Sequence, residues 1–222
     1  MKVFNKIFKK SEYTNNQIFR SNIKYEYCKV SIKHVINWKT ILEQNKIFEF
    51  NNICCLGTRN GREIDLFRIV FFYKYLIPLI RLNEIKKNGY SDLLTFLLSF
   101  NRSNITDKSS VIGVEINPRA KRKDVLIESF DNFPINYEKK FNLVYSNSFD
   151  HSQDPEKTSI EWKRIIKKNG ILIISFSNKS EPTKYDPVGN LNYKDILKLF
   201  PGNLIYYNRS SSNYEDLIIQ FK

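Results

Sequence analysis

The chain has 222 residues, of which 41% are hydrophobic and 14% aromatic. This length suits one substantial domain, and the apolar content excludes a globally disordered chain. The formal charge of +13 leaves two interpretations open, an anion-binding surface or ordinary solvated faces, because the Lys and Arg residues are scattered in pairs along the chain.

The first 50 residues are predicted to form a helical N-terminal extension. Apolar residues recur at near-helical spacing over residues 30–44, which predicts an amphipathic helix. The first residues contain a charge every few positions, unlike a secretory signal. The three cysteines are Cys28, Cys54 and Cys55, and this odd count favours a reducing, cytoplasmic location over a disulfide framework. If residues 52–56 form a strand, Cys54 and Cys55 point to opposite faces and act as buried small hydrophobes.

A domain over residues 51–222 follows, with strands and helices in alternation. The first strand leads into a glycine-containing turn and a helix that begins at Arg62. Residues 66–82 are the most apolar stretch, but their charges and Pro78 argue against a membrane span, so we expect a core-packing helix here. Residues from about 71 to 108 are predicted to be a helical insert.

The remaining elements predict a parallel sheet with a terminal hairpin. Strands are expected at residues 52–56, 111–115, 124–127, 141–145, 170–176, 204–207 and 216–221, with a helix over 154–168. Strands that alternate with helices predict a doubly wound α/β fold with helices on both faces of a mostly parallel sheet. The last two strands, joined by a short polar stretch, predict an antiparallel C-terminal hairpin.

Ligands of such sheets bind beyond the carboxyl ends of the strands. Four candidate segments lie there: the Gly57–Gly61 turn, Glu115, the Ser129-Phe130-Asp131 run, and residues 145–151. Glycines allow a close backbone approach to a ligand, and a carboxylate at a strand end can accept both ribose hydroxyl hydrogens. Asp150 and His151 are the candidates for proton transfer, since imidazole titrates near neutrality, although a single His is also often structural.

The order of these segments resembles the class I S-adenosylmethionine (SAM)-dependent methyltransferases. The matching runs are ICCLGTRNGREIDLF, VIGVEINP, DNFPINYEKKFNLVYSNSFDH and EWKRIIKKNGILIISF, over roughly residues 50–180. The resemblance, which is to the type 11-like small-molecule enzymes, implies a seven-stranded Rossmann-like sheet with its last strand antiparallel. It also implies SAM as the cofactor.

The resemblance assigns roles to individual residues. Gly57, Thr58 and Gly61 would pack against the methionine part of SAM, Glu115 would bind the ribose, and Ile116, Ser129 and Phe130 would border the adenine. Asn147 would line the sulfonium side. Cys55 stands where the family usually has an acid, so Glu63 becomes the candidate for contacting the SAM amino group.

The leading hypothesis is therefore O- or C-methylation of a small metabolite, sugar or lipid-linked acceptor. SNSF stands where base methyltransferases carry an Asn/Asp-Pro-Pro-Tyr signature, which disfavours nucleic-acid bases as acceptors. An alternative is an inactive methyltransferase-like module that binds nucleic acid or a protein partner through its basic surface. A dinucleotide oxidoreductase is disfavoured because the turn lacks G-x-G-x-x-G spacing. No metal site is predicted, and the oligomeric state cannot be read from the sequence.

Overall fold

One mixed sheet organises the chain. The computed structural model describes residues 2–3, 10–25, 27–73, 110–178, 181–209 and 214–222. The sheet has seven strands in the order β4-β3-β2-β5-β6-β9-β8. They are β2 (Asn52–Leu56), β3 (Ser110–Glu115), β4 (Val125–Ile127), β5 (Phe141–Ser146), β6 (Ile166–Ser177), β8 (Asn203–Arg209) and β9 (Tyr214–Gln220). The strands from β4 to β6 are parallel, and β9 pairs antiparallel with β6 and β8, which confirms the predicted sheet and its terminal hairpin.

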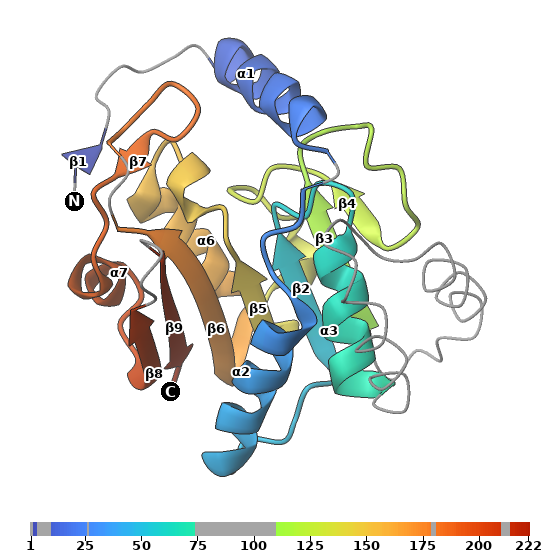
Figure 1. The fold of residues 1–222 in the computed structure, drawn as a ribbon, viewed down its shortest axis with the longest axis vertical. Coiled ribbons are helices and arrows are strands. Elements are labelled where there is room, and N and C mark those ends of the chain that lie inside the picture. Colours follow the sequence, from blue (N-terminus) through green and yellow to red (C-terminus); the bar gives the residue numbers. More distant parts are fainter. Residues whose placement is uncertain (1, 4–9, 26, 74–109, 179–180, 210–213) are drawn as a thin grey trace.

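Helices cover both faces of this sheet, as predicted. On one face α2 (Ile32–Gln44) and α3 (Arg62–Phe72) pack against the strands, in front of the sheet in Figure 1. On the other face α6 (Pro155–Ile165) and α7 (Tyr193–Leu199) bury a second hydrophobic cluster. Cys55 belongs to the first cluster and Cys54 to the second, so the two thiols lie on opposite faces and both are fully buried, as the strand prediction requires.

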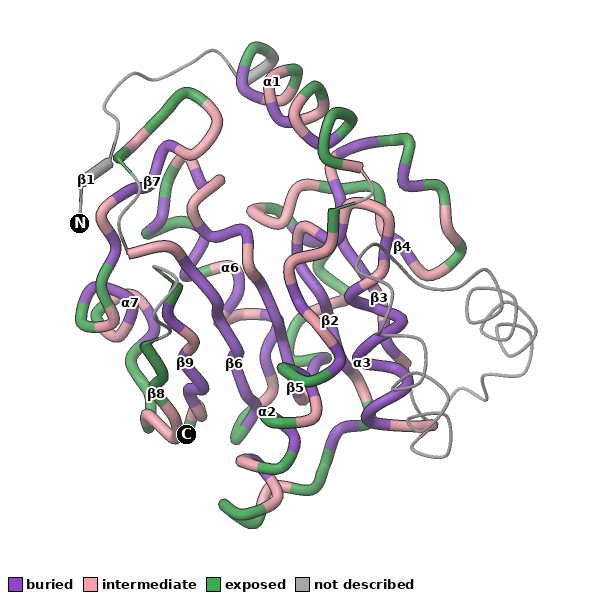
Figure 2. Tube along the Cα trace, viewed as in Figure 1, coloured by how far each residue is buried: buried purple, intermediate pink, exposed green. Residues whose placement is uncertain are grey.

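Aromatic side chains join α2 to the sheet. Trp38, Phe67 and Tyr145 are each at most 1% exposed, and the Tyr145 ring lies 5.3 Å from that of Trp38 and 5.0 Å from that of Phe67. Burial of large apolar side chains contributes about 1.5–3 kcal/mol each. The predicted amphipathic helix is therefore confirmed, and it shares the core of the central strands, which are buried along most of their length (Figure 2).

A further helix, α1 (Lys10–Ile23), crosses the end of the sheet at which β2, β3 and β5 finish (Figure 1). A short strand pair is formed by β1 (Lys2–Val3) and β7 (Val188–Gly189), which run antiparallel. Two single-turn helices complete the described elements, η3 (Ile135–Tyr137) and η4 (Phe149–His151). In the part of the chain that the structure describes, no helix is long and apolar enough to cross a membrane.

The structure differs from the sequence prediction at the end of α6. The helix ends at Ile165 rather than near residue 168, because Ile166 already pairs with Phe141 of β5. The N–H groups of Lys139 and Lys140 donate to the carbonyl oxygens of Arg164 and Ile165, so the last helical acceptors are satisfied by a neighbouring segment. Of the predicted insert at 71–108, only residues 71–73 fall within the described residues.

Candidate functional site

A cleft lies at the carboxyl ends of β2, β3, β4 and β5, beneath α1. The space between its lining residues is about 550 Å³, including the part open to solvent. Its walls are Tyr13, Gln17, Arg20, Ser21, Gly57, Arg59, Glu115, Ile116, Ser129, Phe130, Asp131, Ser148 and His151. The position is where open α/β sheets bind ligands.

Of the eleven residues assigned a role from the sequence, six line the cleft. These are Gly57, Glu115, Ile116, Ser129, Phe130 and His151. The other five predicted site residues do not contribute to its lining: Thr58, Gly61, Glu63, Asn147 and Asp150. Sequence reasoning missed the four α1 residues, because α1 is mostly polar and its contacts are made with partners far along the chain.

The turn after β2 requires glycine at its first position. Gly57 has a φ of +74°, and its N–H donates to the Val114 carbonyl oxygen (2.8 Å). A Cβ at this position would lie 2.5 Å from the Ser148 hydroxyl oxygen, so the backbone of the turn lies directly against the segment after β5. Both the left-handed backbone and the close approach favour glycine over every other residue.

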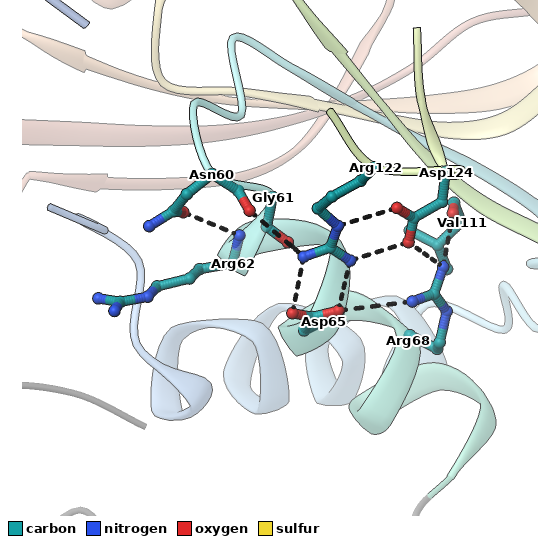
Figure 3. Close-up of polar contacts among 8 residues, drawn as sticks. All are labelled: Asn60, Gly61, Arg62, Asp65, Arg68, Val111, Arg122 and Asp124. Carbon is teal, nitrogen blue, oxygen red and sulfur yellow. Dashed lines mark hydrogen bonds and ion pairs between the residues drawn. The ribbon is translucent and has the colours of Figure 1, made fainter. Parts of the chain in front are cut away.

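Gly61 leaves space for a different neighbour, the Arg122 side chain. It is the N-cap of α3 with a φ of +78°, and a Cβ there would lie 2.8 Å from a guanidinium nitrogen of Arg122. Arg122 donates to the carbonyl oxygens of Asn60 (3.3 Å) and Gly61 (3.1 Å) and to both carboxylate oxygens of Asp65, as Figure 3 shows. The arginine therefore fastens the turn to the first turn of α3.

Asp124 completes this network from the start of β4. Arg122 and Arg68 both donate to its carboxylate, at 2.8–2.9 Å (Figure 3). Partial burial raises the pKa of Asp124, but the hydrogen bonds from the two guanidinium groups outweigh that effect and hold the pKa at about 2. The turn is thus tied to α3, β3 and β4 by paired, hydrogen-bonded charges.

Glu115 is held rigidly at the tip of β3. Its side chain is buried, and one carboxylate oxygen accepts from the N–H of Arg59 (2.8 Å). The other oxygen accepts from the N–H of Asn117 (3.0 Å) and from the Ser21 hydroxyl of α1 (3.5 Å). A carboxylate offers about four lone-pair sites, so Glu115 keeps acceptor capacity for a ligand.

The wall after β4 presents an aromatic face beside polar groups. The Phe130 ring meets Trp162 edge to face at 5.7 Å, and the Phe130 carbonyl oxygen accepts from the indole N–H of Trp162 (3.0 Å). Asp131 accepts from the Thr158 hydroxyl, and burial raises its pKa. An aromatic face flanked by hydrogen-bonding groups suits a planar heterocycle.

His151 lies at the opposite wall, on η4. Its Nδ1 atom is 2.8 Å from a carboxylate oxygen of Asp186 and 3.1 Å from the carbonyl oxygen of Tyr185. Arg20 of α1 pairs with the second oxygen of Asp186 (2.7 Å). Asp186 was not predicted as a site residue, since it follows β6 by nine residues in a loop without a recognisable pattern.

Asp150, His151 and Asp186 also present ligating atoms within 4.8 Å of one another, a spacing that suits a metal ion. The imidazole and Arg20 already contact Asp186. His151, Asp186 and Arg20 form an ion-pair network, and Asp150 stands outside it, with its Oδ1 atom buried and without a hydrogen-bond partner among the described residues.

Glu63 and Tyr145 lie close to the turn but outside the lining of the cleft. Glu63, in the first turn of α3, is 5% exposed, and its Oε2 atom has no hydrogen-bond partner among the described residues. The Tyr145 hydroxyl is likewise buried and without a partner there. Burial raises the pKa of Glu63 to about 7. Unsatisfied buried polar groups are rare and indicate a missing partner, such as a ligand or water.

Thr58 and Asn147 are directed toward protein neighbours. A Cβ at Gly113 of β3 would lie 2.7 Å from the Thr58 hydroxyl oxygen, so that side chain packs over β3. The Asn147 side-chain oxygen accepts from the Ser148 hydroxyl (3.0 Å). Their predicted contacts with a cofactor stay predictions.

No protein-family model matches the sequence, and no curated protein matches it. Solved structures do share its fold. One is 1,6-didemethyltoxoflavin-N1-methyltransferase of Burkholderia thailandensis, with bound 1,6-didemethyltoxoflavin and S-adenosylhomocysteine. It aligns with a TM-score of 0.59 at 9% identity, over 97% of this chain and 92% of that chain.

Two further solved structures align with the chain at lower TM-scores. A SAM-dependent methyltransferase of Thermotoga maritima, described as a possible histamine N-methyltransferase, aligns with a TM-score of 0.51 at 13% identity, over 95% and 99% of the two chains. The cyclase SpnF aligns with a TM-score of 0.50 at 11% identity, over 84% and 80%. The chain has the fold of the class I SAM-dependent methyltransferases, and at these identities the likeness defines the fold alone.

Proposed function

We propose that the protein is a SAM-dependent methyltransferase that binds its cofactor in the cleft under α1. The observation that carries the proposal is the convergence of three strand ends on one space. Gly57 brings backbone to its edge, Glu115 presents a fixed carboxylate, and Phe130 presents an aromatic face. The Gly57 backbone suits the methionine part of SAM, the Glu115 carboxylate suits its ribose, and the Phe130 ring suits its adenine.

Orphaned polar atoms beside the turn support the same cofactor. An ammonium group next to Glu63 would supply the missing partner of its Oε2 atom and favour the ionised carboxylate. This is the role proposed for Glu63 toward the amino group of SAM, in place of the acid that Cys55 replaces. SAM, when bound, supplies an electrophilic methyl group on a sulfonium, so the protein needs chiefly to align the acceptor and receive a proton.

We propose a small metabolite, sugar or lipid-linked molecule as the acceptor, methylated on oxygen or carbon. The wall formed by Ser148 and His151 faces the same space as Glu115, which supports an acceptor position next to the cofactor. The free, buried Cys54 and Cys55 fit a reducing compartment, and we propose a cytoplasmic location on that basis.

Calorimetric titration with SAM and S-adenosylhomocysteine tests the proposal. Glu115→Ala removes the carboxylate at the centre of the cleft and is expected to abolish saturable binding. Glu128→Ala is the matched control, because Glu128 is an exposed acid just beyond β4 and should bind as the wild-type chain does. Absence of binding by the folded wild-type protein at millimolar ligand would refute the proposal.

The charge of +13 favours one alternative, a catalytically inactive module that binds nucleic acid or an acidic protein partner. Its signature is an affinity that falls steeply with salt concentration and does not depend on SAM. Fluorescence anisotropy with a labelled oligonucleotide, measured at several salt concentrations with and without SAM, separates the two functions.

A further inference from the structure

The surroundings of His151 determine which of its nitrogens carries the proton. Both atoms closest to Nδ1 are acceptors, a carboxylate oxygen of Asp186 at 2.8 Å and the Tyr185 carbonyl oxygen at 3.1 Å. Neither can donate to a bare nitrogen, so Nδ1 must bear the hydrogen. In the neutral ring, Nε2 then carries the lone pair. Among the described residues, Nε2 has no hydrogen-bond partner, and His151 lines the cleft.

The same contacts fix the orientation of the ring. Arg20 of α1 holds the far oxygen of Asp186 at 2.7 Å, and the Tyr13 hydroxyl donates to the His151 carbonyl oxygen. Gln17, also on α1, donates to the Tyr185 carbonyl oxygen. The imidazole is therefore fastened through Nδ1 to a loop that α1 itself secures.

The electrostatic balance around the ring favours its protonated form. Burial opposes the charged imidazolium, but the negative charges of Asp150 and Asp186 outweigh burial, so the pKa of His151 lies above its ordinary value. The charged and titratable groups near this network, from each element packed against it, are Tyr13, Arg20, Lys24, Lys29, Asp131, Asp150, Asp186 and Tyr214. Arg20 helps keep the pKa of Asp186 below its ordinary value, against the effect of burial, so Asp186 stays ionised.

From this geometry we infer that His151 is the general base of the cleft and that Asp186 is its positioning residue. The inference rests on the proposed function. It also narrows the proposed acceptors to those whose reacting atom is a hydroxyl oxygen, which carries a removable proton. A half-buried carboxylate beside one ring nitrogen, and an unpaired second nitrogen in a residue that lines the cleft, form an arrangement suited to base catalysis by imidazole.

The proton and electron transfers balance within this arrangement. Nε2 of His151 would take the proton from the O–H bond of the acceptor, and an electron pair of that oxygen would form the bond to the methyl carbon. The carbon–sulfur bond breaks, and its electrons remain on sulfur. The imidazolium that forms is stabilised by Asp186 and releases its proton to solvent after product leaves.

The second histidine provides an internal control for the tautomer. The Nδ1 atom of His34 accepts from the N–H of Ser31 (3.1 Å), so His34 must carry its hydrogen on Nε2, the opposite arrangement. Nitrogen-15 NMR of the histidine side chains distinguishes the two tautomers directly. His34→Gln assigns the two sets of signals, because the chain contains only these two histidines.

At a pH above the pKa of His151 we expect its neutral ring to be the Nδ1–H tautomer, and we expect Asp186→Asn to shift that pKa downward. Arg20→Gln is the matched control: it breaks the other half of the Asp186 pair but removes a positive charge, so it should leave the pKa of His151 in place or raise it. If the His151–Asp186 contact were purely structural, Asp186→Asn and Arg20→Gln would lower the unfolding temperature by the same amount. The Nε2 atom of His151 would then also be inaccessible to reagents.

Carbethoxylation by diethyl pyrocarbonate tests whether the Nε2 atom of His151 is accessible, since the reagent modifies accessible neutral imidazole nitrogens. We expect S-adenosylhomocysteine to slow modification of His151 and to leave His34 unaffected. An Nε2–H tautomer of His151, an unreactive Nε2 in the folded protein, or an unchanged pKa in Asp186→Asn overturns the dyad while cofactor binding is retained. Absence of S-adenosylhomocysteine binding to the wild-type chain instead overturns the proposed function.

Discussion

We expect the buried Glu63 carboxylate to lower the stability of the unliganded protein and to strengthen binding of the cofactor. Burial raises the pKa of Glu63 from its ordinary 4.5 to about 7, and at ~1.4 kcal/mol per pH unit this difference corresponds to about 3 kcal/mol. The sign follows from the raised value. At Glu63 the folded state binds more protons than the unfolded state between pH 4.5 and 7, so the contribution of Glu63 to the free energy of unfolding falls as pH rises through that window and is constant above it.

Glu63→Gln removes the ionisable group and keeps its shape. At pH 4 the variant and the wild-type chain should have similar free energies of unfolding, and at pH 8 the variant should be more stable by up to about 3 kcal/mol. Urea titration followed by fluorescence reports this, because Trp38 and Trp162 are both buried and change environment on unfolding. Glu128→Gln, an exposed acid, should show no such divergence.

The same variant should lose affinity for S-adenosylhomocysteine, because a hydrogen bond to a charged group contributes about 1.5–3 kcal/mol, or roughly a 10- to 100-fold change in Kd. Greater stability at pH 8 together with weaker binding is the combined expectation. A stability difference between Glu63→Gln and wild type that is the same at pH 4 and pH 8 would refute the reasoning about its burial. Unchanged affinity would refute the proposed contact with the amino group.

Two further changes test the turn and its support. Gly57→Ala places a Cβ 2.5 Å from the Ser148 hydroxyl oxygen in a backbone with φ +74°, so we expect a loss of about 1–3 kcal/mol in stability and weaker cofactor binding, measured by thermal unfolding and calorimetry. Asp124→Asn removes a carboxylate whose pKa is held at about 2, so the stability that its ionised form contributes is present above pH 4 and is lost as pH falls toward 2. Allowing for partial exposure, the variant should be less stable by about 1–2 kcal/mol at pH 7 and should approach the wild type near pH 2, where a constant difference would contradict this account.

The sheet could be predicted because each strand carries its own signal. The runs around Ile53, Val114, Val144 and Ile173 are short, apolar and separated by helical or turn patterns, and strands that alternate with helices leave few topologies. The end of α6 was placed wrongly for the opposite reason. Its sequence continues to favour a helix after Ile165, and the residue that ends it is set by pairing with Phe141, a tertiary contact.

The site residues divide in the same way, into those that carry a local sequence pattern and those positioned only by tertiary contacts. Glu115 and Ile116 were found because they stand at the end of a recognisable strand. Asp186 was missed because it acts on His151 across 35 positions of the chain and carries no local pattern. Gly61 was singled out for a cofactor contact, whereas in the structure its missing side chain makes room for Arg122. A glycine pattern reports that space is needed and does not report what fills it.

The role of α1 follows from which of its contacts a ligand could replace. Glu115 accepts from two backbone N–H groups, of Arg59 and Asn117, that belong to the fixed turns after β2 and β3. Its third donor is the Ser21 hydroxyl, at 3.5 Å the longest of the three. A ribose hydroxyl at Glu115 would therefore displace only the weakest hydrogen bond and leave the carboxylate aimed by the other two. Asn117 also donates to the Ser21 hydroxyl and to the Asn22 side-chain oxygen of α1. The contacts of Tyr13, Gln17 and Arg20 go to the wall that carries His151, so α1 can stay in place over the base while the cofactor binds at Glu115.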